Sequence, residues 1–261
     1  MRVICFANQK GGVGKTISCV NLAVSIAQQG QKVLVMDMDL QGNASTYLGI
    51  KPGSIAYDTS LLLEDDNFPL ERAIVPTKYG LDLVPANSTL GRANTTLVGV
   101  LGRENRLREK VENFINRRSN KQYDYIMIDC CPDINLIATN ALMTATDLVV
   151  PIQPKQFAME GMSDLASKIG DLYRKLDPKV KLLGILVTMY REGTALDKVM
   201  VDLLREKIER EFGDGYMFPE VIRGSTVVSE SEKVGPLVVH YPDVPASLAY
   251  RRNAQFIMEK N

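Results

Sequence analysis

The sequence has few of the residues that bind metal ions or form disulfides. Its 261 residues include four cysteines (Cys5, Cys19, Cys130 and Cys131) and one histidine, His240. The cysteines form no CxxC pair, and a zinc site needs about four converging ligands, so we expect neither a structural zinc nor a disulfide framework. Free, buried thiols in a reducing compartment are the expected state.

Long apolar runs and an excess of either charge are also missing. No segment approaches the roughly 18 to 20 continuous apolar residues of a membrane span, and Met1–Ala7 is typical of a strand rather than a signal peptide. Lysine and arginine total 31 and aspartate and glutamate total 31, which argues against a protein that constitutively coats nucleic acid. With 45% hydrophobic residues the chain is too apolar for disorder. We expect a cytoplasmic globular protein.

Short, β-branched runs alternate with helical patterns along most of the chain, as in parallel sheets buried on both faces. The predicted strands are Val3–Ala7, Val33–Met36, Leu81–Val84, Tyr125–Ile128, Leu148–Ile152 and Leu182–Val187. The predicted helices are Lys15–Gln29, Glu104–Arg117, Leu136–Ala145, Met159–Lys175 and Ala195–Phe212. The alternation implies right-handed crossovers and a doubly wound α/β fold, with a mainly parallel sheet and helices on both faces.

No long linker or internal repeat divides the chain, so residues 1–261 are expected to form one domain. The stretch Gly213–Pro245 is the least regular, because glycine, proline and serine interrupt its short apolar pieces. We expect a long loop there, of the kind that carries function or forms a mobile edge.

The strongest motif is a glycine-rich segment, Asn8–Thr16 (NQKGGVGKT), directly after the first strand and at the start of the first helix. Consecutive backbone N–H groups at a helix N-terminus neutralise phosphate, and glycines allow its close approach. Lys15 is expected to reach the β and γ phosphates, and the Thr16 hydroxyl to bind Mg²⁺. A glycine-rich turn beside a lysine is the alternative, which the strand–loop–helix context disfavours. The predicted nucleotide-binding residues are Gly11, Gly12, Val13, Gly14, Lys15, Thr16 and Ile17.

The loop departs from the ordinary phosphate-binding motif at two neighbouring positions. Gln9 stands where the motif has its first glycine, and Lys10 adds a second lysine. We expect Lys10 to point away from its own nucleotide and to contact phosphates held by a second subunit, in the manner of an arginine finger. The alternative is a solvated loop lysine.

These residues and three later segments resemble the ParA/MinD family of ATPases. Lys10–Thr16 is similar to the deviant Walker A box, in which the first lysine is the signature. Asp37–Asn43 (DMDLQGN) resembles the ParA-type box DxDPQGN, and Tyr123–Asp129 resembles the Walker B strand. Pro151–Gln153 followed by Phe157–Gly161 resembles the family's PxQ…ALEGL segment. The resemblance covers nearly the whole chain, and the DxDxQGN form favours the ParA/Soj type over MinD.

Three aspartates stand at predicted strand ends, where open parallel sheets bind ligands. Asp129 ends the Walker B strand and is expected to hold Mg²⁺, through water because Mg²⁺ dehydrates reluctantly. The resemblance implies that Asp39 orients the attacking water and that Asp37 supports the metal network. The alternative is that they are turn or N-cap residues, which are common at strand ends.

The chain departs from the family pattern around this site. Leu40 replaces the usual proline, and Cys131 and Asp133 replace the usual proline and serine in the segment that acts as a nucleotide-sensing switch in relatives. The resemblance also implies that adenine lies near Thr188–Met189 and the loop Phe218–Ile222.

The resemblance further implies an ATP-dependent homodimer that binds DNA without sequence preference and is stimulated by a ParB-like or cargo-adaptor protein. Gly193 and Val227 stand where relatives often have DNA-contacting arginines. Nearby basic residues that could substitute are Arg191, Lys198, Arg223, Lys233, Arg251 and Arg252. A separate basic segment, Glu104–Lys121, is interpreted as an amphipathic helix with a solvated face.

The function expected from this resemblance is the positioning or segregation of a chromosome or plasmid locus, or of a large protein assembly, by a nucleoid-associated ATPase. The main alternative is a MinD-like membrane-surface organiser with a C-terminal amphipathic anchor. The tail Ser247–Asn261 has Leu248 and Phe256 beside Arg251, but packing on the sheet is the preferred interpretation.

Two other classes stay open. An electron carrier similar to the nitrogenase iron protein would need two cysteines per subunit at a bridging cluster. A nucleotide-locked scaffold would bind ATP without useful turnover. Sequence-specific operator binding is not expected, because no extra N-terminal region is present for a helix-turn-helix.

Overall fold

The computed structural model describes residues 1–51, 54–117, 123–133, 135–154, 180–213 and 215–260. The predicted helix Met159–Lys175 and the family-like segment Phe157–Gly161 lie outside these residues, as do residues 118–121 of the basic segment.

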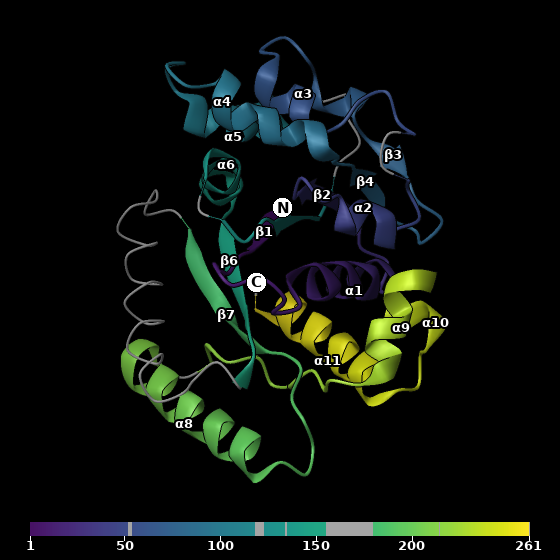
Figure 1. Ribbon diagram of the computed structural model, residues 1–261, viewed down its shortest axis with the longest axis vertical. Helices are drawn as coiled ribbons and strands as arrows, with labels where there is room; N and C mark the ends of the chain where they lie inside the picture. The colour runs from purple at the N-terminus through teal and green to yellow at the C-terminus, as the bar shows by residue number, and fades with distance from the viewer. Residues whose placement is uncertain (52–53, 118–122, 134, 155–179, 214, 261) are drawn as a thin grey trace.

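A seven-stranded sheet with the order β3-β4-β2-β5-β1-β6-β7 forms the centre of the described structure (Figure 1). Its strands are β1 (Arg2–Phe6), β2 (Val33–Met38), β3 (Val75–Pro76), β4 (Asp82–Val84), β5 (Tyr125–Cys130), β6 (Asp147–Ile152) and β7 (Lys181–Val187). Neighbouring strands run parallel, except that β3 pairs antiparallel with β4 at the edge. The predicted mainly parallel sheet is confirmed, including all six predicted strands to within two residues at each end.

Helices cover both faces of the sheet (Figure 1). One face is covered by α1 (Lys15–Ala27), α2 (Asn43–Tyr47), α9 (Thr226–Val234), α10 (Leu237–His240) and α11 (Pro245–Glu259). The other is covered by α3 (Thr59–Glu64), α4 (Ala93–Thr96), α5 (Arg106–Asn116), α6 (Leu136–Thr144) and α8 (Ala195–Phe212). Short 3₁₀ helices occur at Leu70–Arg72, Ser88–Arg92 and Arg103–Asn105.

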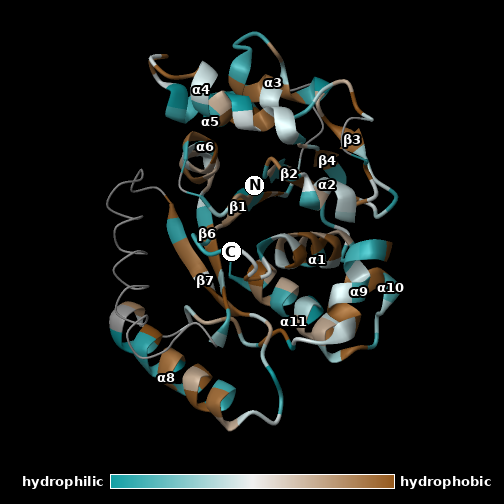
Figure 2. Cartoon of the chain, viewed as in Figure 1, coloured by the Kyte–Doolittle hydropathy of each residue, from teal (hydrophilic) through white to brown (hydrophobic). Residues whose placement is uncertain are grey.

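The central strands separate two apolar cores because successive side chains point to opposite faces of the sheet. In β5, Met127 packs on the α1 side, whereas Ile128 packs on the α6 side. Figure 2 shows the matching hydropathy, with an apolar β7 and mixed colours along α8 and α11. Because Asp129 is two residues beyond Met127, it points to the α1 side, and its register partner in β2, Asp37, does the same. The alternation therefore places both carboxylates beside the start of α1.

The C-terminal region is more regular than its sequence suggested. The predicted loop Gly213–Pro245 contains α9 and α10, so that prediction was wrong. Of the side chains of α9, only Val228 and Ser231 are buried, which leaves too short an apolar stripe to mark a helix. The tail forms α11, which begins with Pro245 in its first turn and packs against α1.

The basic helix α5 is less solvated than expected. Arg106 and Lys110 are buried. Arg106 pairs with Asp66, and the Lys110 ammonium donates to the carbonyls of Asp65, Asp66 and Phe68 at 2.6–2.8 Å. The predicted amphipathic helix is present, with Leu107, Val111 and Phe114 buried. Arg106 and Lys110 are not on its solvated face, because these two side chains tie α5 to the loop after α3. Within the described residues, no helix combines the length and apolarity needed to cross a bilayer.

Candidate functional site

The glycine-rich loop joins β1 directly to α1. Gly12 and Gly14 have φ angles of 71° and 76°, a left-handed conformation that a side chain would strain. The first hydrogen bond of α1 runs from the N–H of Ser18 to the carbonyl of Gly14 at 3.0 Å, so the N–H groups of residues 15–17 are not used within the helix. These N–H groups and the positive end of the helix dipole form an anion-binding site.

Donors from the ends of β6 and β7 hold the loop from behind. The amide of Gln153 donates to the Gly12 carbonyl at 2.6 Å, and the hydroxyl of Thr188 donates to the Val13 carbonyl at 2.8 Å. With the carbonyl oxygens tied on this side, the shape of the loop is set by the protein itself. This contact gives a physical reason for the glutamine of the PxQ segment.

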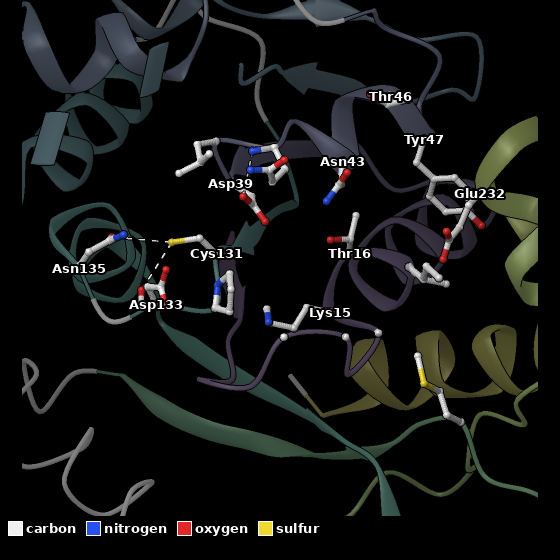
Figure 3. A pocket seen from close by; sticks show the side chains of 18 residues that line it. Lys15, Thr16, Asp39, Asn43, Thr46, Tyr47, Cys131, Asp133, Asn135 and Glu232 are labelled. Atoms are coloured by element: carbon white, nitrogen blue, oxygen red, sulfur yellow. Dashed lines mark hydrogen bonds between the residues drawn. The ribbon is translucent and has the colours of Figure 1, made fainter. Parts of the chain in front are cut away.

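A cavity of about 550 Å³ opens in front of the loop (Figure 3). It is lined by Gly11, Gly12, Gly14, Lys15, Thr16, Ile17, Asp39, Leu40, Gln41, Asn43, Thr46, Tyr47, Cys131, Pro132, Asp133, Asn135, Met189 and Glu232. The structure thus brings most of the predicted phosphate-binding residues together with Asp39 in one site. Val13 is fully buried behind the loop instead.

The two lysines of the loop lie in different surroundings. Lys15 is buried and lines the cavity, and its ammonium donates to the carbonyl of Lys10 at 3.1 Å. Lys10 is exposed and is not part of the cavity wall. Its side chain has no hydrogen-bond or ion-pair partner among the described residues.

Asp37 is buried and fully occupied by hydrogen bonds. One carboxylate oxygen accepts from the N–H and the hydroxyl of Ser45 at 2.8 and 2.7 Å, and the other accepts from the N–H of Asp39 at 3.1 Å. The Ser45 hydroxyl in turn accepts from the N–H of Ala86 at 3.0 Å. Burial raises the pKa of Asp37 to about 6, although the Ser45 bonds act against this rise. Asp37 therefore fixes the start of α2 and the turn that presents Asp39.

Asp129, its register partner, is equally buried but unpaired. Neither carboxylate oxygen has a hydrogen-bond partner in the part of the chain that the structure describes. Burial raises the pKa of Asp129 well above its usual range, the charge of Asp37 raises it further, and the neighbouring Thr16 hydroxyl and Lys15 ammonium oppose the rise. A buried carboxylate without a partner is costly unless a cation or proton joins it. Asp129 and Thr16 therefore fit the donor set that Mg²⁺ prefers.

Asp39 reaches the cavity from the turn after β2. Its side chain accepts from the N–H of Gln41 at 3.0 Å, and its carbonyl accepts from the N–H of Gly42 at 2.9 Å. Gly42 has a φ of 62° and is the N-cap residue of α2. The DxDxQGN pattern thus encodes a tight turn that leaves one carboxylate at the cavity.

The segment after β5 forms the wall opposite α9 (Figure 3). Asn135 caps α6 by accepting from the N–H of Ala138 at 3.0 Å. The thiol of Cys131 donates to the Asn135 side chain at 3.7 Å and to the carbonyl of Asp133 at 3.6 Å. The two positions that depart from the family pattern therefore contact each other in the cavity wall.

The adenine site predicted near Thr188–Met189 and Phe218–Ile222 lies only partly at the cavity. Met189 lines the cavity as predicted, but no residue of 218–222 does, and Phe218 is buried against Phe256. The cavity residues that were not predicted from the sequence are Gln41, Asn43, Thr46, Tyr47, Pro132, Asn135 and Glu232. Asn43 is the last residue of the DxDxQGN pattern, so the motif could have indicated its place in the cavity. No sequence pattern indicates Glu232.

Four of the basic residues considered for DNA contacts have partners within the chain. Arg191 pairs with the buried Asp197 at 3.1 Å, and Arg223 pairs with Glu192. Further, Arg252 pairs with Glu220 at 2.9 Å, and Arg251 donates to the carbonyls of Pro242 and Val238 at 3.0 Å. Lys198 and Lys233 are exposed.

Comparison with known proteins gives the same assignment along the chain. A family model described as an AAA domain matches residues 1–182. The chromosome partitioning protein ParA of Myxococcus xanthus is 35% identical over 241 residues, covering 92% of this chain and 81% of that protein. The chromosome-partitioning ATPase Soj of Thermus thermophilus is 35% identical over 261 residues, covering 100% and 96%.

Solved structures agree with the fold, and one of them carries an ATP analogue and magnesium. Apo McdA of Cyanothece superposes with a TM-score of 0.82 at 18% identity over 99% of both chains, which supports the fold alone. Cobyrinic acid a,c-diamide synthase of Mycobacterium smegmatis, with bound ATP analogue and magnesium, superposes with a TM-score of 0.79 at 27% identity, covering 98% of this chain and 93% of that one. With its two-lysine loop, its DxDxQGN turn and these full-length relatives, the chain belongs to the ParA/Soj type of the ParA/MinD family of deviant Walker A ATPases.

Proposed function

We propose that this chain is a partitioning or positioning ATPase that binds Mg·ATP in the cavity before α1 and dimerises around the bound nucleotide. The observation that carries the proposal is the pairing, in one cavity, of two groups that lack partners among the described residues: the loop N–H groups beside Lys15 and the buried carboxylate of Asp129. An anion and a divalent cation together would satisfy both. The sequence likeness to partitioning ATPases supports the hydrolysis of ATP to ADP and phosphate.

The groups at the phosphate end of the cavity have defined tasks in this proposal. The N–H groups of the loop and the Lys15 ammonium bind the phosphates, and Thr16 and Asp129 hold Mg²⁺, with Asp37 as their support. When bound, Mg²⁺ supplies charge neutralisation at the phosphates. Asp39, at the cavity wall, orients the attacking water. These groups are fixed before any ligand binds, because Gln153, Thr188 and Ser45 hold the loop and the turn.

Lys10 acts across a dimer interface in this proposal. Its exposed ammonium lies outside its own cavity and has no partner among the described residues. A free cation beside a phosphate loop can complete the charge pattern of a second site when two subunits meet face to face. Dimer formation would then depend on bound ATP, and hydrolysis would dissolve the dimer.

The surface that the dimer binds is proposed to be DNA, without sequence preference. A nucleoid-associated dimer of this kind would position its cargo as a ParB-like or cargo-adaptor protein stimulates hydrolysis. Lys198 and Lys233 are the exposed cations that support this proposal, since several nearby arginines already have partners. A membrane-binding alternative has less support, because the apolar face of α11 packs on α1.

Three measurements test the proposal: ATP retention by the monomer, ATP-dependent dimerisation and the rate of ATP hydrolysis. Lys15→Ala should abolish retention. Lys10→Ala should retain ATP but impair dimerisation and dimer-dependent hydrolysis, whereas the exposed Lys32→Ala should match the wild type. Asp39→Ala should bind ATP and accumulate as a dimer that does not turn over. Unchanged retention in Lys15→Ala, or wild-type dimerisation and rate in Lys10→Ala, would contradict the assigned roles.

Co-sedimentation separates the two surfaces. With ATP and Mg²⁺, the protein should pellet with DNA of random sequence and not with anionic liposomes, and added salt should release it from DNA. Pelleting with liposomes alone would favour the membrane alternative, and a phosphate-release assay without any turnover, even with a cognate partner, would favour a nucleotide-locked scaffold. The electron-carrier alternative has no support in the surface, since all four cysteines are buried.

A further inference from the structure

Two carboxylates of the cavity wall, Asp133 and Glu232, have no task in the phosphate chemistry. Glu232 of α9 lines the cavity and is exposed, and it has no hydrogen-bond or ion-pair partner among the described residues. Figure 3 shows Glu232 beside Tyr47, on the side of Thr16 opposite to Asp133 and Asn135. Glu232 therefore lies across the cavity from the segment after β5 that carries Cys131 and Asp133.

The position of Glu232 is fixed by its buried neighbour, Ser231. The Ser231 hydroxyl lies 2.8 Å from that of Tyr47 and donates to the carbonyl of Val228 at 2.7 Å, so the Tyr47 hydroxyl is the donor between them. Tyr47 in turn accepts from the side chain of Asn21 at 3.2 Å. These contacts join α9 to α2 and α1 in a network whose members are all buried. Glu232 thus stands on a rigid support rather than on a free surface helix.

The chemistry of the cavity restricts what Glu232 can meet. A carboxylate repels phosphate and accepts hydrogen bonds. The phosphate-binding groups are the loop N–H groups, Lys15 and Thr16, and the cavity is also lined by Tyr47, Met189 and Glu232. In a nucleotide bound by its phosphates at the loop, the part that lies beyond them is the nucleoside. Met189 offers an apolar contact suited to a base, and Glu232 offers two acceptor oxygens.

We propose that Glu232 accepts hydrogen bonds from the ribose hydroxyl groups of the bound nucleotide and thereby selects ribonucleotides over 2′-deoxyribonucleotides. Vicinal hydroxyl groups match two carboxylate oxygens, as acidic residues do in dinucleotide-binding folds. The inference rests on the proposed function, because it needs a nucleotide in this cavity. It adds a specificity-determining residue that neither the phosphate loop nor the DxDxQGN turn contains.

The test compares ATP with 2′-dATP by equilibrium competition against a labelled non-hydrolysable ATP analogue, in the presence of Mg²⁺. The wild type should bind ATP about tenfold more tightly than 2′-dATP, as expected for the loss of one charge-assisted hydrogen bond. Glu232→Gln and Glu232→Ala should bring this ratio close to one. Glu230→Gln is the matched control, since Glu230 is exposed on the same helix but does not line the cavity, and it should keep the wild-type ratio.

Several results would overturn the inference. Equal affinity of the wild type for ATP and 2′-dATP would do so, and so would a wild-type ratio in both Glu232 variants. If the Glu232 variants changed the ratio of ATP to GTP and left that of ATP to 2′-dATP intact, Glu232 would contact the base instead. If the wild type bound no labelled analogue, the proposed function itself would fail. Thermal melting of each variant checks that the ratio is measured on folded protein.

Discussion

β2 and β5 each carry a buried aspartate near their ends, and the two aspartates differ in the hydrogen bonds that they accept. Asp37 and Asp129 are register partners in neighbouring parallel strands, and both are fully buried on the α1 side of the sheet. Asp37 accepts three hydrogen bonds, from Ser45 and Asp39. Asp129 accepts none from the described residues. One carboxylate is therefore completed by the protein, and the other is left for a ligand.

The difference indicates which acid serves structure and which serves chemistry. A buried charge costs little when donors surround it and much when none does. Natural proteins keep such an unpaired group where a ligand will pair with it. The sequence pattern placed both aspartates in the metal network by resemblance, but their contacts separate them. We infer that Asp37 positions the turn and that Asp129 meets the cation.

The largest effect should come from removing the unpaired acid. Asp129→Asn keeps the shape of the side chain and removes its negative charge, so Mg²⁺ loses its protein carboxylate. We expect the Mg²⁺-dependent ATPase rate to fall at least about 100-fold, measured by phosphate release at saturating ATP with Mg²⁺ varied. A rate restored by high Mg²⁺ would still agree with a metal role. A wild-type rate at every Mg²⁺ concentration would contradict it.

For the free energy of unfolding, the order is reversed: disturbing the hydrogen bonds of Asp37 should cost more than removing the charge of Asp129. Ser45→Ala removes a buried donor to Asp37 and the acceptor of the Ala86 N–H. We expect the free energy of unfolding of the nucleotide-free protein to fall by about 2–3 kcal/mol. Asp129→Asn should leave it unchanged or raise it, because a buried charge without a partner is lost.

Urea denaturation without nucleotide measures both effects. Ser18→Ala serves as a control of similar size, since Ser18 is buried nearby and its hydroxyl contacts only Tyr250 at 3.2 Å among the described residues; its cost should be smaller, about 1 kcal/mol. If Asp129→Asn proved as destabilising as Ser45→Ala, the two carboxylates would be equivalent supports, and the comparison would fail.

The pH dependence of stability should sharpen the comparison further. A carboxyl whose pKa is higher in the folded state than in the unfolded state binds its proton more tightly when folded. Its contribution to the free energy of unfolding is therefore present at low pH. This contribution is lost as the pH rises from the pKa of the unfolded state, near 3.8, through the pKa of the folded state. The pKa of Asp129 is raised well above that value. Wild type should thus lose stability relative to Asp129→Asn as the pH rises from 4 to 7, by at most about 1.4 kcal/mol per pH unit.

Denaturation midpoints of both proteins at a series of pH values measure this difference. Titrating groups far from Asp129 contribute equally to both proteins and cancel in the difference. Asp37 does not cancel, because its charge and that of Asp129 act on each other, so the difference reports the titration of the two acids together. A constant difference between pH 4 and 7 would mean that Asp129 has an ordinary pKa in the folded protein.

The phosphate loop and the acids could be predicted because local rules determine them. A strand, a loop with Gly12 and Gly14 and a helix in that order create the anion site, and parallel strands bring their carboxyl ends to one edge. The predicted strands matched for the same reason, since each is a short apolar run. Which acid is satisfied could not be predicted, because that depends on Ser45 and on the N–H groups around it in space.

The far wall of the cavity could not be predicted from the sequence. Glu232 follows Ile17 by more than 200 residues, and α9 has few buried side chains to reveal it as a helix. Its place depends on the buried hydroxyl contact between Tyr47 and Ser231. Long-range polar contacts of this kind leave no periodic pattern, so residues positioned by them are visible only in the folded structure.

The smallest effect should come from the supports behind the loop, which carry no charge. Thr188 is buried, and its one hydroxyl proton is shared between the carbonyls of Val13 at 2.8 Å and Ile152 at 2.9 Å. Thr188→Val keeps the volume and removes this shared hydrogen bond, so the free energy of unfolding should fall by about 1 kcal/mol. ATP affinity should fall only several-fold, because Lys15 and the N–H groups stay in place. Calorimetric titration with a non-hydrolysable analogue measures this, with Thr188→Ser, which keeps the donor, retaining nearly wild-type affinity. A loss of ATP affinity in Thr188→Val as large as that in Lys15→Ala would show that the shape of the loop, more than its charge, governs binding. The contrast between structural and ligand-binding groups drawn for Asp37 and Asp129 would then not extend to the loop.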